Sequence, residues 1–122
     1  MGEAMSRAET KRFDSPDESR AFPNGKVDLV HIGAGTVGRF TVQPGWRWSK
    51  DVKPIAKTDW CEAPHFQYVL SGTMRVRLSD GTEFDVRAGD VSLLGPGHDA
   101  WVVGDEPVIA VDWSGATNYA TR

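Results

Sequence analysis

The sequence predicts an all-β domain, a sandwich or barrel built from many short strands. Three observations support this fold class. Apolar and polar residues alternate over segments of about four to eight residues, which is the pattern of a half-buried strand. Glycine, proline and aspartate mark turns between these segments at short intervals. No long segment shows the helical period of about 3.6 residues.

The chain is expected to begin with a flexible N-terminal segment, residues 1–22, because this part is polar and contains no apolar run. Within it, Ser15, followed by Pro16 and Glu18, could cap a short helical turn. The barrel domain is placed at residues 23–122.

The strands follow one another through this domain. Asp80-Gly81 stands between two alternating segments and is a strong signal for a two-residue hairpin turn. We expect strands at Val27–Ile32, Val37–Val42, Asp59–Glu62, Phe66–Ser71, Thr73–Leu78, Glu83–Val86, Val91–Leu94, Ala100–Val103 and Val108–Trp113.

Length and composition limit the classes of function. A chain of 122 residues suits one domain with a modest core. Its net charge of −3 argues against a nucleic-acid partner. No segment is apolar and long enough for a signal peptide or a membrane span. The single cysteine, Cys61, cannot form an intrachain disulfide, which predicts a reducing, cytoplasmic setting.

Five sequence marks occur in a fixed order: Y-V-L-S-G, D-G-T-E, A-G-D before an apolar strand, P-G-H and V-G-D-E-P. With these marks the chain resembles a small single-domain cupin over roughly Gly45 to Trp113. The resemblance implies a double-stranded β-helix, the cupin jelly-roll barrel. The strands between Val27 and Val42 would complete it.

The first motif of this family usually contains two histidines and a glutamate, with a glycine seven residues after the glutamate. If Gly72 is that glycine, the resemblance places His65 at the glutamate position. It then places Asp59 and Cys61 where the two histidines normally stand.

The second motif of the family has a histidine after a Pro/Gly turn. Counting back from V-G-D-E-P places it at His98, whereas counting forward from Gly89 places it at Ala100. His98 is preferred because it requires only a shortened loop. The resemblance thus implies the metal ligands Asp59, Cys61, His65 and His98.

These four side chains are competent donors for a divalent metal, with zinc preferred because of the Cys61 thiolate and iron second. Asp59, Cys61, His65 and Gln67 have equal parity, so an extended segment would point them to one face. The alternative is structural. The histidines would be hydrogen-bonded barrel residues, Asp59 a turn residue and Cys61 a small core residue.

A ligand pocket is expected beside the two histidines, lined by Gln67, His31, Trp48 and Trp101. His31 lies mid-strand on an apolar face, where a core or pocket histidine is expected. Trp46 and Trp48 share a strand face. They either wall the barrel mouth, with Arg47 or Lys53 pairing an anionic ligand, or pack a dimer interface or the outer sheet.

The sequence therefore predicts a small cupin that binds a small molecule in the barrel, with a metal as the candidate cofactor and no organic cofactor. Two alternatives remain: a metal-dependent oxygenase- or isomerase-type enzyme, and a non-catalytic dimeric structural or sensory barrel. No catalytic residue is assigned. The expected partners are a small-molecule ligand and a second copy in a homodimer, formed through Trp46 and Trp48 or through edge strands, with no nucleic acid and no membrane.

Overall fold

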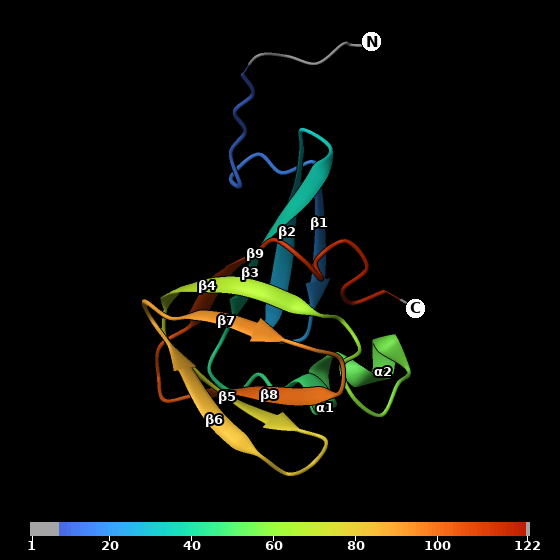
Figure 1. Cartoon of the computed structure of the whole chain (residues 1–122), viewed down its shortest axis with the longest axis vertical. Coiled ribbons are helices and arrows are strands. Elements are labelled where there is room, and N and C mark those ends of the chain that lie inside the picture. Colours follow the sequence, from blue (N-terminus) through green and yellow to red (C-terminus); the bar gives the residue numbers. More distant parts are fainter. Residues whose placement is uncertain (1–7, 122) are drawn as a thin grey trace.

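The computed structural model describes residues 8–121, and in this part of the chain it contains nine strands and two short helices (Figure 1). The all-β prediction is confirmed. The strands are β1 (Glu18–Phe22), β2 (Gly25–Ile32), β3 (Gly35–Val42), β4 (His65–Ser71), β5 (Thr73–Leu78), β6 (Glu83–Arg87), β7 (Val91–Leu94), β8 (His98–Val103) and β9 (Val108–Asp112).

The strands form two antiparallel sheets with the core between them. The larger sheet has the order β1-β2-β3-β9-β4-β7, and the smaller one has the order β6-β5-β8. Figure 1 shows the small sheet facing the β4–β7 end of the large sheet. Val69 of the large sheet and Val76 of the small sheet are fully buried. Burying a valine side chain contributes about 1.5–3 kcal/mol relative to leaving it exposed.

Strand β4 positions the functional site, because its side chains alternate between the interior and the outer surface. His65, Gln67 and Val69 point inward and are buried, whereas Phe66 and Leu70 point outward. The strand lies between β9 and β7, so that Gln67 has Asp112 and Ser92 as cross-strand partners. The alternation of side chains predicted for this segment is therefore present in β4, and it places His65 on the core face.

The N-terminal prediction needs a correction. Residues 18–22 form strand β1, which pairs along its whole length with β2, although the sequence placed them in a flexible segment that contained a helical turn. Phe22 is buried and its ring packs on Tyr119, while the Ser19 hydroxyl donates to Asp28. These contacts hold the segment in the sheet. The first seven residues of the expected flexible segment lie outside the described part of the chain.

The stretch around Trp46 and Trp48 also differs from the expected strand. Trp48 begins the helix α1 (Trp48–Asp51), and the helix α2 (Lys53–Ala56) follows directly. The Asp51 carboxylate accepts a hydrogen bond from the Arg47 backbone N–H, 3.0 Å away, and stabilises this turn. Both tryptophans are buried, at 4% and 2% exposure, so they wall the interior of the barrel. Neither is available for an interface between copies of the chain.

The C-terminal segment, residues 114–121, folds back beside β1 (Figure 1). The Arg20 guanidinium donates to the backbone carbonyl of Tyr119, 2.9 Å away. The segment packs tightly, since a Cβ on Gly38 of β3 would lie 2.4 Å from the Ala116 Cβ. Tyr119 is thereby held 5% exposed against the core.

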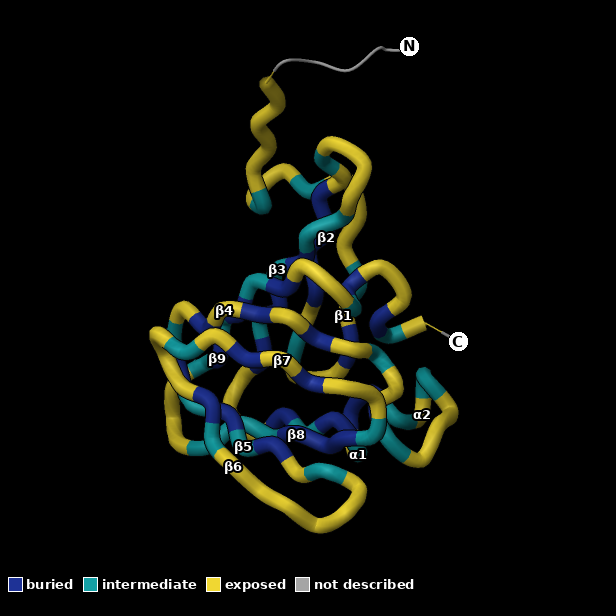
Figure 2. Tube along the Cα trace, in the orientation of Figure 1, coloured by how far each residue is buried: buried dark blue, intermediate teal, exposed yellow. Residues whose placement is uncertain are grey.

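Six large apolar side chains lie exposed on the outer surface of the large sheet, and we call them the outer apolar face. They come from β4, from the edge strand β7 and from the residue that follows β9. Figure 2 shows exposed and buried residues alternating along β4 and β7. The exposed residues are Phe66, Tyr68, Leu70, Val91, Leu93 and Trp113. In the described residues, the helices are far too short to cross a membrane.

Candidate metal centre

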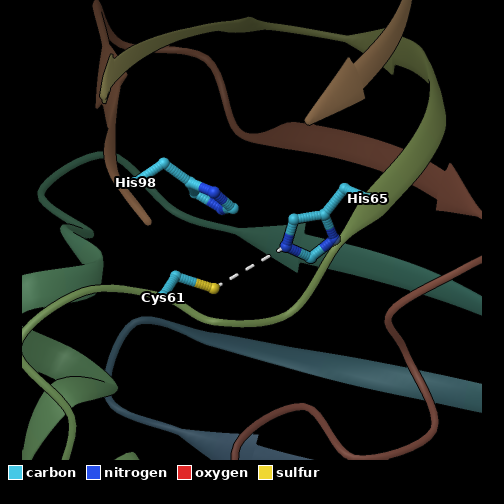
Figure 3. A group of neighbouring side chains, drawn as sticks. All are labelled: Cys61, His65 and His98. Carbon is cyan, nitrogen blue, oxygen red and sulfur yellow. Dashed lines mark hydrogen bonds between the residues drawn. The ribbon is translucent and has the colours of Figure 1, made fainter. Parts of the chain in front are cut away.

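Three buried side chains meet inside the barrel: Cys61, His65 and His98 (Figure 3). Their possible ligand atoms all lie within 4.8 Å of one another, and Cys61 Sγ is 3.8 Å from His65 Nε2. These are three of the four residues that the resemblance assigned to a metal. At the second motif it is His98, and not Ala100, that joins the cluster.

The backbone fixes two of these residues relative to each other. Cys61 and His98 form an isolated antiparallel bridge. In this bridge the Cys61 N–H donates to the His98 carbonyl, 2.8 Å away, and the His98 N–H donates to the Cys61 carbonyl, 3.3 Å away. His65 is the first residue of β4 and faces them from the large sheet. The cluster therefore joins the two sheets.

Both histidine rings are held by a hydrogen bond at the same ring nitrogen, Nδ1. His65 Nδ1 bonds a carboxylate oxygen of Asp112, and His98 Nδ1 lies 2.9 Å from the Gly95 carbonyl oxygen. Each partner can only accept a hydrogen bond, so Nδ1 carries the proton in the neutral ring. In both rings Nε2 is then left with a free lone pair. This is the arrangement that supporting hydrogen bonds give to metal-ligating histidines.

Asp112 contacts the cluster and was not identified from the sequence. It lies on β9 and has no exposed surface. Its second carboxylate oxygen accepts from the backbone N–H groups of Phe66 and Ser114, at 3.2 and 2.8 Å. The signal for it was weak: a single aspartate within the otherwise apolar strand V-I-A-V-D-W.

Tyr119 was also missed, because it lies in a C-terminal segment with no strand pattern. Its ring centre lies 5.8 Å from that of His65 and 4.6 Å from that of Phe40, which itself packs edge-on against His65. Burial raises the pKa of the Tyr119 hydroxyl well above its usual value, so the ring is neutral at physiological pH.

Burial also sets the protonation of the cluster. It raises the pKa of the Cys61 thiol to about 12. Burial, with a smaller contribution from nearby His65, lowers the pKa of His98 to about 4. At neutral pH the site therefore contains a thiol and a neutral His98 imidazole. A metal that binds Cys61 as thiolate must displace its proton, so binding strengthens as the pH rises.

A small cavity adjoins the cluster. Its volume is about 40 Å³, and its walls are mainly aromatic and aliphatic, with Gln67, Trp46 and Trp48 among them. One water needs about 10–15 Å³ of such space, so the cavity accommodates about three waters or a ligand of similar size. A larger groove, of about 420 Å³, lies against α2 and the C-terminal segment. It shares Trp48, Cys61 and Tyr119 with the cavity.

The structure does not bring Asp59 to the cluster. Its side chain is 94% exposed and lies 3.9 Å from the Lys53 ammonium group. Residues 58–60 form a bend, so the parity of an extended strand does not apply there. Asp59 is thus a surface residue, as in the structural alternative.

Two predicted pocket residues, His31 and Trp101, do not line the cavity. His31 lies exposed on the β2–β3 hairpin, with Nδ1 3.1 Å from the Thr36 hydroxyl. Trp101 lies on β8, where its ring stacks under the Arg47 guanidinium at 4.2 Å. Arg47 also pairs with Asp99, 3.2 Å away, and so is occupied by protein groups. Gln67 and Trp48, the other two, do line the cavity.

No known family profile matches the sequence. No curated protein matches it either. The structure, in contrast, is similar to solved structures. One is an uncharacterised conserved protein with a double-stranded β-helix domain from Klebsiella pneumoniae. It is 20% identical, with a TM-score of 0.59, and the match covers 96% of this chain and 92% of that one.

Two further similar structures carry more specific names. A cupin-like protein from Thermotoga maritima is 16% identical, with a TM-score of 0.57, over 80% of this chain and 73% of that one. A mutant oxalate decarboxylase from Bacillus subtilis is 24% identical, with a TM-score of 0.55, over 86% of this chain and 28% of that one. Together the similarities confirm the predicted double-stranded β-helix. At these identities they establish the fold and not the chemistry.

Proposed function

From the premise that this chain folds as a small cupin, we propose that Cys61, His65 and His98 hold a divalent metal and that a small molecule binds beside it. Zinc is the preferred metal and iron the second candidate. The observation that carries the proposal is that both histidine rings carry their proton on the same nitrogen, Nδ1. Asp112 and Gly95 accept from their Nδ1 atoms, which leaves both Nε2 atoms without a proton, and the Nε2 of His65 lies 3.8 Å from the Cys61 sulfur.

The spacing of the donors fits this metal. Tetrahedral zinc with bonds of about 2.0–2.3 Å places its ligand atoms about 3.3–3.8 Å apart. Cys61 Sγ and His65 Nε2 are 3.8 Å apart, and the whole cluster lies within 4.8 Å, so small side-chain adjustments close it around an ion. Three protein ligands leave one position open for a small molecule. A metal held by these residues would act as a Lewis acid and polarise an oxygen atom of a small molecule bound at the open position.

Binding is favoured over acid–base catalysis by the walls of the cavity. Among the described residues that line it, only the three cluster residues and Tyr119 can ionise. Burial raises the pKa of Tyr119 well above its ordinary value, so this hydroxyl is a poor proton donor or acceptor near neutral pH. The alternative, a metal-dependent oxygenase- or isomerase-type enzyme, would have to rely on the metal for its chemistry.

Metal analysis tests the proposal. The protein is purified without added metal, loaded separately with zinc and iron, and its metal content is measured by mass spectrometry. About one metal ion per chain is expected in the wild type, with at least tenfold weaker binding in His98→Ala and Cys61→Ala. His31→Ala, which removes an exposed histidine outside the cavity, is the matched control. Metal content near zero in the wild type and in His98→Ala alike would remove the proposal.

We also propose that the chain forms a homodimer through the outer apolar face. The six side chains of this face are 37–78% exposed. Monomers rarely expose continuous apolar patches larger than a few hundred Å², so a face of six large apolar side chains marks an interaction site. A standard interface buries about 800 Å² on each partner, and this face would form its apolar centre. A second copy, related by a two-fold axis, would cover both faces at once.

A further inference from the structure

Two buried hydrogen-bond donors beside the cavity have no acceptor among the described residues. They are the side-chain amide nitrogen of Gln67, Nε2, and the indole nitrogen of Trp46, Nε1. Both residues line the cavity and are only 3% and 4% exposed. A buried donor left without an acceptor costs about 1–3 kcal/mol, and native proteins keep few of them. The contents of the cavity are therefore the natural source of the acceptors.

The position of Gln67 links its amide to the metal cluster. Gln67 follows His65 by two residues on β4, so the two side chains point to the same side of the sheet. Its cross-strand neighbour on β7, Ser92, has a buried hydroxyl that is itself without a partner, so Ser92 does not satisfy the amide. The Gln67 amide thus lies on the same side of β4 as His65 and has no acceptor among the described residues.

We propose that the cavity binds a small carboxylate, whose oxygens accept hydrogen bonds from Gln67 Nε2 and Trp46 Nε1. A volume of about 40 Å³ limits this ligand to a few non-hydrogen atoms, as in formate or acetate. Met74 and Leu94 supply apolar wall for a methyl group. The metal would balance the ligand charge, because a divalent ion with one thiolate and two neutral imidazoles keeps a net positive charge. Only this last part rests on the proposed function.

Nuclear magnetic resonance of ¹⁵N-labelled protein tests the inference directly. Acetate is titrated into the zinc-loaded and the metal-free protein, with neutral acetamide of similar size as the comparison ligand. The side-chain amide signal of Gln67 and the indole signal of Trp46 are followed, after assignment with Gln67→Leu and Trp46→Phe. Acetate is expected to shift both signals and to leave the signal of the exposed Trp113 indole unchanged. Acetamide is expected to bind at least tenfold more weakly.

Gln67→Leu removes the amide donor and keeps a side chain of similar volume. It is expected to weaken acetate binding about tenfold or more, since a hydrogen bond to a charged group is lost, while the zinc content stays near one per chain. Gln43→Leu, at an exposed glutamine, is the matched control and should bind acetate as the wild type does. Equal acetate affinity in Gln67→Leu and the wild type would overturn the inference.

The wild-type titration decides the matter even if a variant fails to fold. If zinc binds and acetate shifts neither signal, the carboxylate inference is wrong and the metal proposal stands. If no zinc binds but acetate shifts both signals in the metal-free protein, the two donors do recognise the ligand and the metal proposal falls. Shifts of equal size and affinity with acetamide would contradict the choice of an anion.

Discussion

The carboxylate of Asp112 and the carbonyl of Gly95 each accept a hydrogen bond from a histidine ring of the cluster. Neither group is a member of the cluster, yet each determines which nitrogen of its histidine ring carries the proton. The chemistry available at His65 and His98 therefore depends on residues outside the candidate metal site.

Asp112→Asn tests this dependence. The amide oxygen can still accept from the Phe66 and Ser114 backbone N–H groups, but its nitrogen now donates to His65 Nδ1. The ring proton then moves to Nε2 and occupies the lone pair that a metal needs. We expect zinc affinity to fall about 10- to 100-fold, measured by competition with a chromophoric chelator.

Asp28→Asn is the matched control, because Asp28 is equally buried but lies on β2, where it pairs with Arg39. It should retain wild-type zinc affinity. An equal loss of affinity in both variants would show a general effect on folding and would contradict the role given to Asp112.

The low pKa of His98, about 4, makes the stability of the metal-free protein depend on pH in a defined window. The unfolded chain takes up a proton at this residue below about pH 6.5, whereas the native ring stays neutral down to about pH 4. The unfolded state thus binds more protons in this window, so stability is complete above it and decreases as the pH falls through it. The loss should reach about 3 kcal/mol.

Urea unfolding in the presence of a chelator, at a series of pH values, measures this loss. His98→Gln should flatten the profile between about pH 6.5 and 4, whereas His31→Gln should leave it unchanged. A wild-type profile that is already flat in this window would contradict the lowered pKa of His98.

At the scale of the residue, the sequence predicted the cluster in part. Cys61, His65 and His98 were predicted because this sequence keeps the spacing of the family's motifs, although some of the residue types at the ligand positions differ. Asp59 was wrongly included, since counting positions does not show that residues 58–60 bend away from the barrel. Asp112 was missed because its partner, His65, lies far away in the sequence and only strand pairing brings the two together.

The strands were predicted more completely than the helices. The alternation that predicted β2 to β9 reflects burial on one face of each strand, which is a local property of the sequence. The helices α1 and α2 have four residues each, so they are too short to show a helical period. Strand β1 was missed because its core contact, between Phe22 and Tyr119, is not local.

The contact between β3 and the C-terminal segment can be tested with one glycine. A Cβ on Gly38 would lie 2.4 Å from the Ala116 Cβ, so Gly38→Ala must displace the segment that holds Tyr119. We expect a loss of about 1–3 kcal/mol in the free energy of unfolding, measured with urea. Faster hydrogen exchange is expected in the segment itself.

Gly35→Ala, in the same strand, is the control, because its Cβ would meet nothing closer than 3.9 Å. It should change the free energy of unfolding by no more than a few tenths of a kcal/mol. If Gly38→Ala is as stable as Gly35→Ala, the C-terminal segment is not fixed against β3 in the way described.

For the whole molecule, the outer apolar face predicts association. Leu93 is 78% exposed on the edge strand β7, near the exposed side of Phe66. Leu93→Glu places a charge within the proposed interface, where desolvating it is costly. We expect the wild type to scatter light as a dimer at micromolar concentration, and Leu93→Glu to scatter as a monomer with unchanged zinc content.

Glu83→Leu, at an exposed position of β6 in the other sheet, is the control for a change of charge outside this face and should leave the mass unchanged. A wild type that remains a monodisperse monomer at high concentration would contradict the dimer.

The bridge between Cys61 and His98 has a consequence for how this site can change. Its hydrogen bonds join backbone atoms only, so a substitution of either side chain keeps these donors and acceptors. Cys61→His would exchange sulfur for nitrogen in the same backbone bridge and move the preference of the proposed site away from soft metals. In such a barrel, metal selectivity can evolve by single substitutions while the architecture stays constant.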